Sequence, residues 1–186
     1  MMDMMVREVR QVVQGDLRII RFGSCGSISE DLHVGSIAVA DSSCFISNVL
    51  NTFTISPIVE PSMELTRRLY EGIKDQIKDP VVMGLNATCD SFYSSQGRRD
   101  DKFKDDNQNL LLVLKEKYPK VITMEMETFQ LFALATKSLE KIQVASCTMV
   151  YASRLSKGAE FINVQKVEEF VMVVGKCILD ILISED

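Results

Sequence analysis

The stretch LRIIRFGSCGS, residues 17–27, decides the predicted fold of this chain. Residues 17–22 form a short apolar run that predicts a buried strand, and residues 23–27 predict a tight loop after it. Glycines can bring backbone N–H groups close to an anion, while Arg21 offers a guanidinium fork and Ser24 a hydroxyl donor. The segment therefore predicts a phosphate site, although a Gly-Ser-x-Gly turn taken alone is more often structural.

Outward from this stretch, short apolar runs alternate with segments of helical periodicity. Further strands are predicted at residues 36–40, 81–85, 121–124 and 144–150. Helices are predicted at about residues 5–13, 65–77, 110–117, 126–136 and 167–182. Residues 41–61 lack clear periodicity and predict mostly loop, whereas the polar residues 86–106 predict a long functional loop with some helix.

The alternation of strands and helices predicts one α/β domain over residues 1–186. We expect a three-layer α/β/α sandwich in which helices cover both faces of a mixed, largely parallel sheet. Ligands of such sheets bind at the carboxyl ends of the strands. The segments after Phe22, Leu85, Met124 and Val150 are therefore the places where a site is expected.

Composition excludes several classes of function. The chain has 186 residues, 46% of them hydrophobic, and a net charge of -5, which disfavours a nucleic-acid partner. Its five cysteines are odd in number and none lie at Cys-x-x-Cys spacing, so we expect no disulfide framework, no metal site and a cytoplasmic location. No signal peptide or membrane-spanning run is recognised. The single histidine, His33, and the loop thiol of Cys25 are interpreted as structural.

A second segment with chemical potential is CDSFYSSQGR, residues 89–98. It combines an aromatic face with an amide, which both donates and accepts, and a guanidinium. Uracil needs such a set, because its O4, N3–H and O2 present acceptor, donor and acceptor along one edge. A polar surface loop with one buried Phe explains the composition equally well.

The third segment is MEMET, residues 124–128, at the end of a predicted strand. Two carboxylates that flank a Met are unusual there, because a buried carboxylate is costly without partners. Ribose hydroxyls are suitable partners, and Met can cover the apolar face of a sugar. Alone, a helix-start Glu and a solvated Glu remain the slightly better explanation.

The three segments together resemble the nucleoside phosphorylase family, and its uridine-cleaving branch most closely. The family's phosphate, base and ribose segments read Arg-x-Gly-Ser/Thr-x-Gly, Phe-Tyr-x-x-Gln-x-Arg and Glu-Met-Glu. The resemblance runs from about Met5 to the end of the chain, and the Phe-Tyr-x-x-Gln-Gly-Arg motif at residues 92–98 is its specific part. It implies reversible cleavage of uridine, with deoxyuridine as a further candidate, by phosphate to give uracil and the pentose 1-phosphate.

The resemblance implies roles at the phosphate and ribose end of such a site. Arg21 and Ser24 would hold the attacking phosphate. Glu127 would bind the ribose hydroxyls, Met126 would lie against the sugar, and Glu125 would support that segment. The resemblance implies inorganic phosphate as the only co-substrate, with no metal or organic cofactor.

The resemblance also implies roles at the base end. Gln96 and Arg98 would contact the uracil edge and stabilise the leaving anion, and Phe92 would pack against the base or sugar. Tyr151 and its neighbours would line the base pocket, and Arg154 matches an arginine of the uridine branch. Arg98, Gln96 and Arg21 are thus the expected catalytic residues.

Two alternatives to uridine phosphorolysis stay open. One is a purine phosphorylase or nucleosidase of the same fold; those enzymes usually place an Asp after a Ser in this region, whereas Ser153 is followed by Arg154. The other is a non-catalytic remnant that binds a nucleoside without turnover.

The sequence departs from the family pattern at its start. Family members begin with further strands and a Gly-Asp-Pro-x-Arg loop whose Arg also contacts phosphate, and this sequence contains no such loop. We therefore expect weak or no activity from these 186 residues alone. The family also assembles each active site from two subunits, so a homodimer or higher oligomer is expected.

Overall fold

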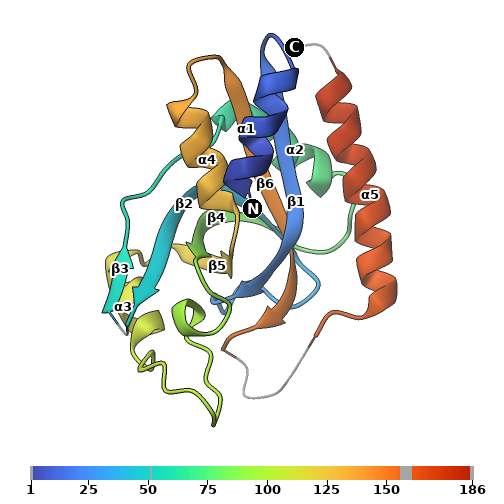
Figure 1. The fold of residues 1–186 in the computed structure, drawn as a ribbon. Coiled ribbons are helices and arrows are strands. Elements are labelled where there is room, and N and C mark those ends of the chain that lie inside the picture. The colour runs from blue at the N-terminus through green and yellow to red at the C-terminus, as the bar shows by residue number, and fades with distance from the viewer. Residues whose placement is uncertain (1, 51, 156–160, 185–186) are drawn as a thin grey trace.

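A computed structural model describes residues 2–50, 52–155 and 161–184. In chain order its elements are α1 (Met2–Val12), β1 (Leu17–Ser27), β2 (Ile37–Val49), β3 (Thr52–Ile55), α2 (Met63–Lys74), β4 (Val81–Cys89), the short 3₁₀ helix η1 (Ser94–Gln96), α3 (Leu110–Lys117), β5 (Val121–Glu125), α4 (Thr128–Lys137), β6 (Ile142–Ser153) and α5 (Val164–Ile183). Figure 1 shows their arrangement in space. No helix in this part of the chain combines the length and apolar character needed to cross a membrane.

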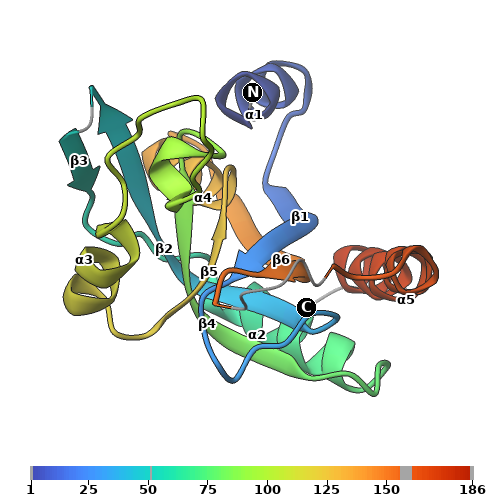
Figure 2. The same cartoon turned by 90° about the horizontal axis from the view of Figure 1, so that it is seen from below.

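The strands form one mixed sheet of six in the order β3-β2-β4-β5-β1-β6. The pairings β1–β6, β2–β4 and β4–β5 are parallel, whereas β2–β3, β1–β5 and β2–β6 are antiparallel. The β2–β6 pairing joins residues 37–39 to residues 147–149 and so closes the sheet into a ring from β2 through β4, β5, β1 and β6. Figure 2 shows this ring from below.

Helices cover the sheet on two sides, which confirms the predicted α/β fold with its mixed sheet and flanking helices. On one side α2 and α5 pack on β2 and β6 in a core that includes Leu69, Phe170 and Val174. On the other side α1 and α4 pack on the start of β1 and β6 through residues such as Leu131 and Phe132. The short α3 packs on β2, β4 and β5 in a third cluster.

Three predicted loops are wrong in whole or in part. Residues 23–27 continue β1, with a register shift against β6 between Cys25 and Gly26. The range 41–61 contains the second half of β2 and its hairpin partner β3. Residues 86–89 complete β4, and only the rest of the range 86–106 is irregular or 3₁₀.

Long-range pairing explains why these strands escaped the sequence pattern. In β2 the polar Ser43 sits in the interior, and its hydroxyl lies 3.3 Å from that of Thr88 on β4. A strand with polar groups on its buried face does not alternate cleanly, since the partners that satisfy those groups come from elsewhere in the chain.

Candidate active site

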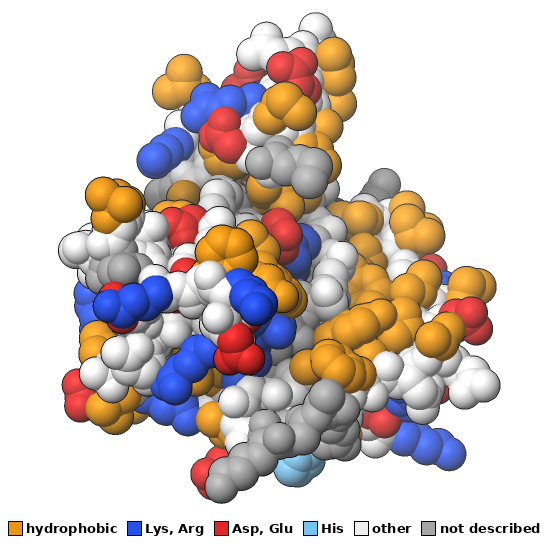
Figure 3. Space-filling model, turned by 60° about the horizontal axis from the view of Figure 1, so that its bottom comes forward, with side chains coloured by type: hydrophobic (Ala, Val, Ile, Leu, Met, Phe, Trp, Pro, Cys, Tyr) orange, Lys and Arg blue, Asp and Glu red, His pale blue; other side chains and the backbone are white. Residues whose placement is uncertain are grey.

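A cleft of about 550 Å³ opens near the ends of the strands, between residues of β1, β5, β6 and the segment after β4. Figure 3 shows the face with the bottom of Figure 1 brought forward, where basic, acidic and hydrophobic side chains gather closely near the centre. The cleft is lined by Arg21, Gly23, Ser24, Cys25, Gly26, Phe92, Gln96, Arg98, Met124, Glu125, Met126, Glu127, Tyr151, Ala152 and Phe161. All three sequence segments singled out above therefore meet in one place.

At one end of the cleft, Arg21 is held between two carboxylates. Its Nη2 lies 3.2 Å from Glu125 Oε2 and also donates to the carboxylate of Glu127. The absence of a side chain at Gly23 makes room for the guanidinium, because a Cβ there would fall 2.7 Å from Nη2. Gly23 is therefore needed because it leaves space for the Arg21 side chain, and not because the backbone turns sharply there.

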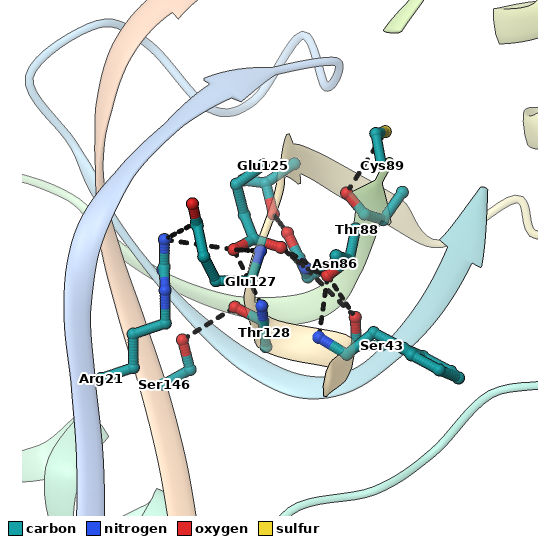
Figure 4. Close-up of polar contacts among 12 residues, drawn as sticks. Arg21, Ser43, Asn86, Thr88, Cys89, Glu125, Glu127, Thr128 and Ser146 are labelled. Atoms are coloured by element: carbon teal, nitrogen blue, oxygen red, sulfur yellow. Dashed lines mark hydrogen bonds and ion pairs between the residues drawn. The ribbon is translucent and has the colours of Figure 1, made fainter. Parts of the chain in front are cut away.

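Glu125 is almost completely buried, at 4% exposure, and is fully engaged (Figure 4). Its Oε1 accepts hydrogen bonds from Asn86 Nδ2 at 2.6 Å and Thr88 Oγ1 at 2.5 Å. Its Oε2 accepts from the backbone N–H groups of Glu127 at 2.9 Å and Thr128 at 3.0 Å. The carboxylate therefore fixes the turn between β5 and α4.

The charge state of Glu125 follows from these contacts. Burial alone would raise the pKa of this carboxyl, but the Arg21 charge and the hydrogen bonds from Thr88, Asn86 and the Glu127 N–H outweigh it. The pKa of Glu125 consequently lies below its ordinary value, and the group is ionised at neutral pH.

Three further residues assigned to this end differ in exposure. Ser24 is exposed on β1 and lines the cleft. Met126 and Glu127 are half-buried, and the Glu127 carboxylate reaches Arg21 across the cleft wall. The structure thus joins the expected phosphate ligand Arg21 to the expected ribose ligand Glu127, a pairing that the sequence did not indicate.

At the other end, two arginines face one aromatic ring. The guanidinium carbon of Arg98 lies 3.8 Å from the ring centroid of Phe92, and that of Arg154 lies 5.9 Å from it. Arg154 Nη2 donates to Oε1 of the buried Gln96. Gly26 lies beneath Arg154, since a Cβ there would fall 2.7 Å from Nε.

The surroundings of both arginines disfavour their charged form. Burial, and secondarily the charge of Arg98, lowers the pKa of Arg154 to about 10, and burial also lowers the pKa of Arg98. Nε of each is buried without a hydrogen-bond partner among the described residues, as is Nη1 of Arg21. Buried donors without partners are costly, so this cleft favours a ligand that brings acceptors or negative charge.

The remaining lining residues include one that sequence reasoning missed. Phe161 is 63% exposed and pairs with Ala152 in an isolated antiparallel bridge, which brings it beside Tyr151. Phe161 belongs to no recognisable motif, so only the bridge reveals its place. Tyr151, which the resemblance assigned to the base pocket, lines the cleft and is 41% exposed.

Cys25 and His33, both interpreted from the sequence as structural, differ in exposure. Cys25 lines the cleft but is buried, and burial raises the pKa of its thiol to about 12, so it is no nucleophile at neutral pH. His33 is exposed in the turn before β2, where its carbonyl accepts from Ser36 N–H. Within the described ranges, no group of three His, Cys, Asp or Glu side chains is placed to hold a metal ion.

Comparisons with known proteins agree on a family. A family model described as the phosphorylase superfamily matches residues 1–184. A structure from a study of two uridine phosphorylases of the oomycete Phytophthora capsici is similar with a TM-score of 0.92 and 32% identity, covering 100% of this chain and 71% of that one. A nucleoside phosphorylase of Trypanosoma brucei, described as showing uridine phosphorylase activity, has a TM-score of 0.74 and 20% identity over 90% of this chain and 64% of its own, a likeness of fold.

The similar curated sequences are purine nucleoside phosphorylases, not uridine phosphorylases. The DeoD-type purine nucleoside phosphorylase of Bacillus subtilis is 32% identical over 123 residues, which are 64% of this chain and 46% of that protein. The corresponding protein of Oceanobacillus iheyensis is 28% identical over 124 residues. The match thus spans about half the length of these relatives.

Proposed function

Because this chain belongs to the phosphorylase superfamily, we propose that its cleft catalyses the reversible phosphorolysis of uridine to uracil and ribose 1-phosphate. The observation that carries the proposal is the pairing of Gln96 with Arg154 beside Arg98 and Phe92, at the opposite end of one cleft from Arg21 and Glu127. A planar base with acceptors on its edge suits the first end, and a sugar with an anion suits the second.

The base end can stabilise a leaving uracil anion. Gln96 Oε1 accepts from Arg154 and keeps a second lone pair for uracil N3–H, which turns its NH₂ group toward a carbonyl oxygen of the base. Arg98, stacked on Phe92, supplies a cation for the charge that develops as the bond from the base to C1′ breaks. Preorganised donors of this kind are typically worth about 3 kcal/mol each in the transition state.

The sugar end supplies the nucleophile and holds the ribose. In the proposed reaction a phosphate oxygen attacks C1′ while the electron pair of the C1′–N1 bond leaves with uracil. Arg21 and Ser24 would hold the phosphate, and the Glu127 carboxylate would accept from the ribose hydroxyls with Met126 against the ring. Glu125 stays outside the chemistry in this scheme, since its oxygens are already engaged.

Purine nucleoside phosphorolysis is the second candidate, and the identity to the DeoD-type proteins favours it. An enzyme that cleaves purine nucleosides benefits from an acid beside purine N7, because protonation there makes the base a better leaving group. The side chain that follows Ser153 is instead the cation Arg154, and it is directed to Gln96. That contact supports a pyrimidine with an acceptor-rich edge.

We further propose that the protein works as a homodimer or higher oligomer in the cytoplasm, with a neighbouring subunit completing each site.

The test is to incubate the protein with uridine, with and without inorganic phosphate, and to quantify uracil and ribose 1-phosphate by chromatography. We expect uracil and ribose 1-phosphate in equal amounts, and only when phosphate is present. Release of uracil without phosphate would indicate a hydrolase. Release from inosine or adenosine but not from uridine would move the protein to the purine branch, and no release from any nucleoside would favour a binding remnant.

A further inference from the structure

We propose that Asn86 and Thr88 on β4 are positioning residues that hold Arg21 and the turn at Glu127 in place through the Glu125 carboxylate. Neither residue lines the cleft, and no motif of the sequence points to them. The inference concerns the arrangement of the site, and its catalytic consequence rests on the proposed phosphorolysis.

Both residues lie wholly inside the protein and point to one face of β4 because they are two positions apart (Figure 4). Asn86 is 2% exposed and Thr88 is 0% exposed. The Asn86 carbonyl oxygen accepts from Thr123 Oγ1 at 2.9 Å, which orients its NH₂ group toward Glu125. The same NH₂ group lies 3.1 Å from Ser43 Oγ and 3.1 Å from Thr88 Oγ1.

The Thr88 hydroxyl connects Glu125 to helix α4. It accepts from the backbone N–H of Phe129 at 2.8 Å and donates to Glu125 Oε1 at 2.5 Å. Phe129 lies in the first turn of α4, so Thr88 ties the start of that helix to the carboxylate. Among the described residues, the polar side-chain atoms of this anchor (Ser43, Asn86, Thr88, Thr123 and Glu125) all have hydrogen-bond partners, as a polar cluster in a protein interior requires.

The two carboxylate oxygens of Glu125 therefore contact different groups. Oε1 is anchored by Asn86 and Thr88, whereas Oε2 faces Arg21 and the N–H groups of the following turn. Rotation of the carboxylate would break the contacts of both oxygens together. Loss of the anchor at Oε1 should consequently release the Arg21 guanidinium and the Glu127 peptide, which face the cleft.

Few titratable groups face Glu125, so a new carboxyl at position 86 can be followed by pH. They are Arg21 and Cys25 on β1, Cys89 on β4, and Glu127 before α4. Burial raises the pKa of both thiols, to about 12 for Cys25, so they stay neutral at the pH values of the experiment. If Asn86→Asp responds to pH between about 5.5 and about 8 and the unchanged protein does not, the response is therefore assigned to the introduced carboxyl and Glu125.

The experiment uses Asn86→Asp and Thr88→Val, with Thr88→Ser as the matched control that keeps the hydroxyl. In Asn86→Asp the introduced carboxyl can donate to Glu125 when it is protonated, as the amide does, whereas its ionised form repels Glu125. Since two carboxyls within hydrogen-bond distance cannot both ionise easily, the introduced group should titrate between about pH 5.5 and about pH 8.

The first readout is the guanidinium NMR signal of Arg21 in ¹⁵N-arginine-labelled protein without ligand, identified through Arg21→Lys. We expect a sharp signal in the unchanged protein and in Thr88→Ser. In Thr88→Val the signal should be broadened at every pH, and in Asn86→Asp it should be broadened at about pH 8 and recover at about pH 5.5. An Arg21 signal unchanged in both variants would overturn the proposal, as would equal loss in Thr88→Ser.

The second readout is phosphorolysis at several phosphate concentrations. We expect the KM for phosphate to rise about 10-fold in Thr88→Val and in Asn86→Asp at about pH 8, with recovery of the latter toward about pH 5.5 relative to the unchanged protein. An unchanged KM in both variants would also overturn the proposal. If the unchanged protein fails to cleave uridine, the proposed function fails, and the Arg21 signal still decides the positioning role.

Discussion

The substitution Gly26→Ala should weaken the binding of the base without unfolding the protein. A Cβ at this position would lie 2.7 Å from Arg154 Nε and 3.3 Å from its Cδ. Unstrained carbon contacts lie at about 3.5–4.0 Å, so the Arg154 side chain must move by about 1 Å. It can do so because it is long and flexible, whereas the backbone of Gly26 needs no positive φ that alanine would resist.

The size of the effect follows from the contact that Arg154 gives up. Its Nη2 donates to Gln96 Oε1, and a Cβ introduced at position 26 would push the guanidinium out of line with that oxygen, which breaks this hydrogen bond. A hydrogen bond to a charged group contributes about 1.5–3 kcal/mol, and its loss frees the Gln96 amide to rotate away from the base. The Kd for uridine should therefore rise about 10- to 100-fold.

Isothermal titration calorimetry with uridine, in the absence of phosphate so that no turnover occurs, measures this directly. Gly175→Ala is a matched control, because a Cβ at this position of α5 would meet nothing within 4 Å. The control should leave the Kd unchanged and stabilise the protein by about 0.5–1 kcal/mol, since glycine is unfavourable inside a helix. An unchanged Kd for uridine in Gly26→Ala would refute the role given to the Arg154–Gln96 contact.

Further predictions concern the opposite end of the cleft and the buried charge. Gly23→Ala would place a Cβ 2.7 Å from Arg21 Nη2, so we expect a Kd for phosphate about 10-fold higher by calorimetry, with the Tm within a few degrees of the unchanged protein. Glu125→Gln should lower the free energy of unfolding in urea by about 3 kcal/mol at pH 7, because it removes the charge that Arg21 faces in the interior. Folding lowers the pKa of Glu125, so its ionised carboxylate stabilises the protein above the ordinary pKa of 4.5, and this stabilisation is lost as pH falls through the folded pKa. The difference in unfolding free energy between the unchanged protein and Glu125→Gln should therefore vanish in acid. A difference that stays constant with pH would contradict this assignment. Iodoacetamide at about pH 8 should not inactivate the protein, since a Cys25 thiol with a pKa of about 12 is ionised to a fraction on the order of 10⁻⁴, and rapid inactivation traced to Cys25 would show that it is reactive.

The sequence carried enough information to predict the layers and the place of the cleft. Helical periodicity and short apolar runs mark most elements because burial on one face leaves a regular pattern. The segments after Phe22, Leu85, Met124 and Val150 do converge, since the ends of neighbouring strands meet at one edge of a sheet. The motifs then identified which side chains stand there.

The parts that escaped prediction depend on partners far apart in the chain. Ser43 is compatible with a buried strand only because Asn86 and Thr88 meet it on β4. The ion pair between Arg21 and Glu127 joins residues 106 positions apart, and each alone indicates a separate subsite. No local pattern encodes such pairings, and Phe161 likewise reaches the cleft through a single bridge.

The measurement that tests the central claim most directly is the ratio of kcat/KM for uridine to that for inosine, with phosphate present throughout. If Gln96, Arg98 and Arg154 recognise the edge of uracil, uridine should be preferred by about 100-fold or more, because a site built around a hydrogen-bonded edge leaves its polar groups unpaired with the wrong base. Equal rates, or a preference for inosine, would contradict the assignment of this cleft to uridine.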